Sequence, residues 1–86
     1  MPPGGTLEIV TSFARMVEPL PVLVEKAIQI AWDFLERSGE ITDPVDASRF
    51  LLRNIDDMAR AGELRELMLA NQAIRAYQRY KRLLAA

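Results

Sequence analysis

The chain has 86 residues, the size of one domain, and half of them are hydrophobic while 27% are charged, as in an ordinary globular protein. The formal net charge is −1, so the overall balance gives no attraction to nucleic acid or to an anionic membrane. The absence of cysteine excludes disulfides and thiolate chemistry, and the absence of histidine removes the commonest metal ligand and general base.

The first five residues, MPPGG, precede any periodic pattern and predict a flexible lead-in at 1–5, followed by a single helical domain at 6–86. No basic segment followed by a long apolar run is present, so no signal peptide is predicted. Apolar runs are also far shorter than a membrane span requires. We therefore expect a cytoplasmic protein.

Residues 6–17 are predicted to form a short amphipathic helix. At about 100° per residue, their apolar side chains fall within one arc and the polar ones lie opposite. The arc contains Ile9, Val10, Phe13, Met16 and Val17. A helix this short is not stable alone in water, so its apolar face is expected to dock on another part of the protein.

A second helix is expected over 20–38, beginning after two closely spaced prolines and ending at Gly39, which suits a left-handed cap. Its predicted core stripe contains Val24, Ala27, Ile28, Ala31, Phe34 and Leu35. Trp32 lies off one edge of this stripe, and Leu23 and Ile30 flank the other.

The strongest helix-start signal is Asp43–Pro44, because aspartate caps a helix and proline suits its first position. The third helix is predicted from Pro44 to about Ala61. Its core stripe contains Leu51, Leu52, Ile55, Met58 and Ala59, with Phe50 outside it. Gly62 is expected to end the helix. The alternative, one helix from Pro44 to Leu84, would place a costly glycine in its interior.

Two segments resemble each other at an offset of 23 residues: FLERSGEI (34–41) and DMARAGEL (57–64). We interpret them as two helix ends with the same cap chemistry, rather than as a duplication.

The last helix is predicted over 63–84 and has two apolar faces, which one neighbouring helix would not cover. One face contains Leu67, Ala70, Ile74 and Tyr77; the other contains Leu69, Ala73, Ala76, Tyr80 and Leu83. Either the helix is central in its own bundle, or the second face packs against a second copy. Because Phe50 and Trp32 add apolar surface outside their own stripes, we expect a homodimer.

A basic stripe follows on the same helix, with Arg75, Arg79 and Arg82 on one face and Lys81 nearby. It could bind phosphates, with a tyrosine stacking on bases, or an acidic protein surface. It could also simply complement the negative end of the helix dipole. A helix-turn-helix is not favoured, because the helix starts with the mostly apolar and acidic ELRELMLAN.

No nucleophile–base pair, phosphate-binding glycine loop or calcium loop is evident, so we expect no enzyme activity, metal or cofactor. The sequence predicts an all-α, compact bundle of about four helices that associates through its C-terminal helix. The expected function is that of a small protein-interaction or regulatory module, with itself or another protein as partner. The alternative is a nucleic-acid-associated protein using the basic stripe.

Overall fold

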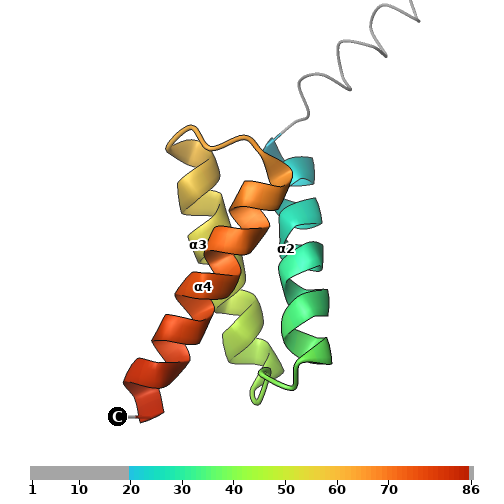
Figure 1. Cartoon of the computed structure of the whole chain (residues 1–86). Helices are drawn as coiled ribbons and strands as arrows, with labels where there is room; N and C mark the ends of the chain where they lie inside the picture. Colours follow the sequence, from blue (N-terminus) through green and yellow to red (C-terminus); the bar gives the residue numbers. More distant parts are fainter. Residues whose placement is uncertain (1–19, 86) are drawn as a thin grey trace, which may run out of the picture.

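The computed structural model describes residues 20–85, which form three helices and contain no strand (Figure 1). These are α2 (Leu20–Arg37), α3 (Pro44–Arg60) and α4 (Glu66–Ala85). Consecutive helices run in opposite directions, and each contacts the other two (Figure 1). The all-α class is therefore confirmed. The predicted lead-in at 1–5 and the predicted helix at 6–17 lie outside the described residues.

The start of α3 follows the prediction from Asp43–Pro44. Asp43 has an extended backbone (φ −127°, ψ 102°), and its carboxylate accepts the backbone N–H groups of Val45 and Asp46 at 3.1 and 3.2 Å. These N–H groups have no partner within the helix, so the carboxylate satisfies them. The cap fixes where α3 begins.

The ends of α2 and α3 have the same geometry. Gly39 and Gly62 have positive φ angles of 73° and 113°. The residue after each glycine donates its N–H to the carbonyl five residues earlier, at 2.9 Å in the first case and 3.0 Å in the second. This is the hydrogen bond of a glycine C-cap. It explains the resemblance between segments 34–41 and 57–64, and the predicted break at Gly62 is confirmed.

Helix α4 begins at Glu66, three residues later than the predicted Glu63. The Glu63 carboxylate accepts the backbone N–H of Arg65 at 3.1 Å and its guanidinium at 2.8 Å. The Arg65 carbonyl then accepts the N–H of Leu69 at 2.9 Å, so Arg65 occupies the capping position. Because the Glu63 side chain folds back onto Arg65, residues 63–65 form a connection outside the helix.

The core lies where the three helices meet. It consists of Leu23, Val24, Ala27, Ala31, Leu35, Ala47, Leu51, Ile55, Ala59, Leu69, Ala70, Ala73, Ile74 and Tyr77. Most of the predicted stripes are therefore correct. The alanines on all three helices allow the backbones to approach closely, so that the larger Tyr77, Leu35 and Leu51 side chains fill the centre.

Three residues predicted in core stripes are exposed instead: Phe34 (50%), Leu52 (54%) and Leu67 (66%). Phe34 lies near the C-terminal end of α2, where α4 has diverged from α2 (Figure 1). Leu52 lies at the edge of the α3 stripe, beside a groove that α4, the third helix of the described residues, does not line. Leu67 lies in the first turn of α4. In each case a neighbouring helix, rather than the local pattern, decides burial.

Candidate functional site

An aromatic cluster joins α3 to the C-terminal half of α4. The ring of Phe50 stacks on that of Tyr80, with centroids 4.7 Å apart and planes at 20°. It also meets the buried ring of Tyr77 edge-on, at 5.6 Å and 66°. Such arrangements are favoured by the charge distribution of aromatic rings. The prediction that Phe50 lies outside the stripe of α3 is correct, and its neighbours are the α4 tyrosines.

The two tyrosines differ in their hydroxyl groups. Tyr80 donates to both carboxylate oxygens of Asp46, at 3.1 and 3.0 Å, and this hydrogen bond, together with burial and the carboxylate's charge, raises the pKa of Tyr80. The Tyr77 hydroxyl is buried and has no hydrogen-bond partner among the described residues. Burial, followed by the charges of Asp46, Asp43 and Glu40, raises the pKa of Tyr77. Both phenols therefore lose their protons at a higher pH than an ordinary tyrosine, because the pKa of each is raised.

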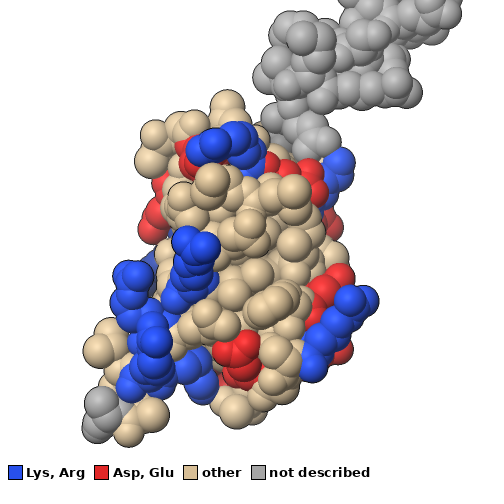
Figure 2. Space-filling view, viewed as in Figure 1, with Lys and Arg blue, Asp and Glu red and all other residues tan. Residues whose placement is uncertain are grey.

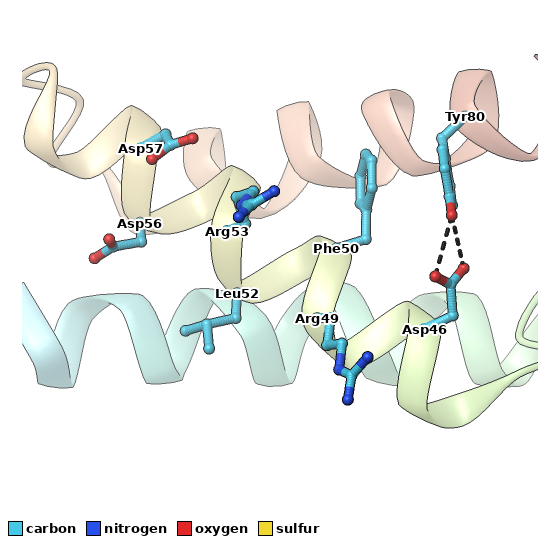
Figure 3. Close-up of a pocket in the computed structure, with 8 residues that line it drawn as sticks. All are labelled: Asp46, Arg49, Phe50, Leu52, Arg53, Asp56, Asp57 and Tyr80. Atoms are coloured by element: carbon cyan, nitrogen blue, oxygen red, sulfur yellow. Dashed lines mark hydrogen bonds between the residues drawn. The ribbon is translucent and has the colours of Figure 1, made fainter.

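The cluster forms one wall of a shallow hollow of about 590 Å³ between α3 and α4 (Figure 3). Its lining combines aromatic, acidic and basic side chains: Asp46, Arg49, Phe50, Leu52, Arg53, Asp56, Asp57 and Tyr80. In Figure 3, Phe50 and the hydrogen-bonded pair Tyr80–Asp46 lie at one end, and the neighbouring carboxylates of Asp56 and Asp57 lie toward the other. A surface of this kind can offer apolar contact and charges of both signs.

The predicted interface residues do not share one surface. Leu69 and Ala73 are fully buried in the core of the single chain. Their position in the wide apolar arc of α4 is explained because α4 packs against both α2 and α3, rather than against one neighbour. As surface residues for association, both are therefore excluded.

The other predicted interface residues remain accessible to different degrees. On α4, Ala76 and Tyr80 are half-buried, while Leu83 is 71% exposed. These three positions are spaced i, i+4 and i+7, so they follow one face of the helix. Trp32 is half-buried on α2, where its indole N–H donates to Glu36 at 2.8 Å, and it does not line the hollow beside Phe50. Sequence reasoning missed Leu84, which is 62% exposed beside Leu83.

The basic stripe divides into two parts. Arg75, Arg79 and Arg82 are exposed, and their side chains form no hydrogen bond or ion pair with another residue in the range 20–85. Lys81 is half-buried, and its ammonium group donates to the Thr42 hydroxyl at 2.7 Å, which ties α4 to the α2–α3 connection. Figure 2 shows basic side chains gathered over the C-terminal part of α4. Three arginines of the stripe thus remain available to a partner.

Gln78 also links this end of α4 to the α2–α3 connection, because its amide donates to the carboxylate oxygens of Glu40 at 3.1 and 3.3 Å.

Within residues 20–85, no group of three or more acidic side chains is arranged to hold a metal ion. No helix in the same range has the length and apolar character needed to cross a membrane.

Compared with family models, curated proteins and solved structures, the chain gives no significant match.

Proposed function

We propose that the chain is a small helical protein-interaction module that binds a second copy of itself. The contact would be made by the Leu83 face, which we define as Phe50, Ala76, Tyr80 and Leu83. The observation that carries this proposal is the 71% exposure of Leu83, which extends an apolar row on α4 beyond the core. Removing an exposed leucine from water at a contact lowers the free energy, so this burial would stabilise a complex.

The surroundings of the Leu83 face favour a second copy as the partner. In a twofold symmetric dimer the same patch is used by both chains, so it must be complementary to itself. The adjoining hollow carries both arginines, such as Arg53, and carboxylates, such as Asp57. Each charge on one copy can therefore face an opposite charge on the other, while Leu83 and Tyr80 supply the apolar centre.

Oligomeric state tests this proposal, with Leu83→Glu as the disrupting variant. The wild-type chain should scatter light as twice its mass of 9.7 kDa or more. Leu83→Glu should give the mass of one chain while its far-ultraviolet circular dichroism remains helical, because an exposed position tolerates the charge. A wild-type protein that stays monomeric at high concentration would refute self-association.

The matched control is Leu67→Glu. Leu67 is another exposed leucine on α4, at 66% against 71% for Leu83. By the helical rotation of about 100° per residue, the two side chains point about 160° apart. Leu67→Glu should leave the mass unchanged. Equal dissociation by both variants would show that added charge, rather than the Leu83 face, drives the effect.

A second candidate function, binding to nucleic acid, is favoured by the three exposed arginines that have no partner in the described part of the chain. Arg75 and Arg79 would contact phosphates, so binding of a single-stranded oligonucleotide should weaken steeply as salt is raised. Replacing both by alanine should abolish that binding, while replacing Arg37 and Arg53 on the other helices should not. Binding that does not depend on salt concentration, or that is unchanged when Arg75 and Arg79 are both replaced by alanine, would exclude this candidate function.

We further propose that the complete bundle has about four helices, with residues 6–17 supplying the remaining one. This proposal is supported by the apolar arc predicted for that segment and by a groove between α2 and α3 on the described bundle.

A further inference from the structure

A groove runs between α2 and α3 on the side that α4 does not cover. Its volume is about 580 Å³, and only residues of α2 and α3 line it. Leu20, Val24 and Ile28 form its α2 wall, at a spacing that places all three on one helix face. Leu52 forms part of the α3 wall. The groove therefore offers the apolar surface on which the apolar face of an amphipathic helix can dock.

The lining residues differ in exposure: the middle of the α2 wall already belongs to the core, whereas its Leu20 end and the α3 wall remain accessible to solvent. Val24 is only 5% exposed, whereas Leu20 is 37% and Leu52 is 54% exposed. Charged groups lie at the rim, where Asp56 accepts the guanidinium of Arg60 at 2.8 Å. Covering the groove would remove these apolar side chains from water, which favours docking.

The chain outside the described residues ends at this groove. Leu20 is both the first described residue and part of the lining. Only residues 18 and 19 separate it from the segment 6–17, whose sequence predicts an apolar arc. Connections of two to five residues commonly join antiparallel helix pairs. A helix at 6–17 that turned back at Pro19 would therefore begin its contact at the Leu20 end.

The lengths agree as well. At 1.5 Å per residue, a twelve-residue helix is about 18 Å long, and the stretch from Leu20 to Ile28 extends about 12 Å. In an antiparallel arrangement Val17 would lie near Leu20, and Ile9 would lie near Ile28 and Leu52. The predicted apolar arc is then long enough to cover the whole groove.

We propose that residues 6–17 dock in the α2–α3 groove of the same chain, with Ile9, Val10, Phe13, Met16 and Val17 facing it. Tethering by two residues makes the effective concentration of the segment high, on the order of millimolar, so a weak contact is enough to keep it docked. This inference does not rest on the Leu83 face, whose residues do not line the groove. The hollow beside that face shares Leu52 and Asp56 with the groove, so a groove residue outside the hollow, Leu20, is used to separate the two proposals.

Tryptic release of the fragment 1–15 from the full chain tests the docking. Arg15 is the first cleavage site in the sequence, and a docked segment must open before it is cut. Leu52→Glu places a charge in the groove wall and should speed release on the order of tenfold. The control Leu67→Glu, at a leucine on α4 that is 66% exposed against 54% for Leu52, should not. Equal release from wild type and both variants would overturn the proposal.

Disulfide trapping gives a second test that does not depend on a disruptive variant. The chain has no cysteine, so the pair Ile9→Cys and Leu52→Cys introduces the only two thiols. Oxidation should yield a cross-link within one chain, whereas the control pair Ile9→Cys and Leu67→Cys should not cross-link. A cross-link between two chains, or equal cross-linking of both pairs, would contradict docking within the chain.

Light scattering separates this inference from the proposed self-association. Leu20→Glu, which changes a residue that lines the groove but not the hollow beside Tyr80, should release the 1–15 fragment faster without changing the mass of the particle. Leu83→Glu should change the mass without changing tryptic release. If Leu20→Glu instead gave the mass of one chain while the wild type is larger, the groove would be an interface between copies and intramolecular docking would be wrong.

Discussion

Tyr80 and Asp46 are 34 residues apart in the chain, yet the Tyr80 hydroxyl donates to both carboxylate oxygens of Asp46, at 3.1 and 3.0 Å. The bond links the C-terminal half of α4 to the first turn of α3. Phe50 stacks on the same tyrosine ring at 4.7 Å, so one side chain makes both a polar and an apolar contact between the two helices.

This hydrogen bond predicts a loss of stability at alkaline pH. Because the bond to Asp46 raises the pKa of Tyr80 above its ordinary value of 10.0, the folded state keeps a proton that the unfolded state loses. The resulting stability is complete below about pH 10 and is lost as pH rises through the folded-state pKa. Urea unfolding between pH 8 and pH 11 should show the decline, and Tyr80→Phe should reduce it. An identical decline in the variant would assign the effect to other groups.

Removal of the Tyr77 hydroxyl should affect stability at pH 7 differently from removal of the Tyr80 hydroxyl, because the Tyr77 group is buried without a partner among the described residues. Leaving a buried donor unsatisfied costs about 1–3 kcal/mol. Tyr77→Phe should therefore leave the free energy of unfolding unchanged or raise it by about 1 kcal/mol, whereas Tyr80→Phe should lower it. Chemical denaturation at pH 7 measures both. Clear destabilisation by Tyr77→Phe would reveal a hydrogen bond to the hydroxyl.

The Asp43 cap predicts a specific cost for removing its carboxylate. Asp43→Ala should lower the free energy of unfolding by about 1 kcal/mol, because two backbone N–H groups at the start of α3 lose their acceptor. Asp43→Asn keeps an acceptor oxygen and should restore most of the loss. Asp57→Ala, an exposed carboxylate on the same helix, serves as the control. The urea midpoint should be lowest for Asp43→Ala, higher for Asp43→Asn and highest for Asp57→Ala. Equal effects of Asp43→Ala and Asp57→Ala would argue against the cap.

Replacing Gly62 by alanine should change the stability of the protein in opposite directions, depending on whether the helix ends at Gly62 or continues through it. Its φ of 113° lies in a region that residues with a Cβ rarely adopt, so Gly62→Ala should cost roughly 1–3 kcal/mol. Within one continuous helix the same substitution would instead stabilise the protein by about 1 kcal/mol. Gly39→Ala, at a φ of 73°, should also destabilise, but less. Thermal unfolding distinguishes the signs, and a higher melting temperature for Gly62→Ala would contradict the break.

Local signals predicted the helix boundaries well because caps involve only neighbouring residues. Asp43 and Pro44 set the start of α3, and Gly39 and Gly62 set the ends of α2 and α3. The start of α4 was predicted three residues early, because no periodic pattern shows that the Glu63 side chain turns back onto Arg65.

Burial was harder to predict because it depends on which helices meet. Leu69 and Ala73 were assigned to an interface, but two neighbours within the chain bury both of them. Conversely, Leu52 fits the core stripe of α3 and is nevertheless 54% exposed, because α4 covers the other side of that helix. The hollow with Phe50 and Tyr80 combines residues from α3 and α4, and this pairing becomes visible only in three dimensions. The four-helix count and the dimer stay predictions.

The half-buried position of Trp32 gives the protein its own optical probe. It is the only tryptophan in the chain, it packs partly on the core, and its indole N–H donates to Glu36 at 2.8 Å. Its emission will therefore shift to longer wavelength when α2 leaves the bundle and water reaches the ring. Unfolding, and any partner that covers this part of α2, can be followed by fluorescence in the unlabelled protein.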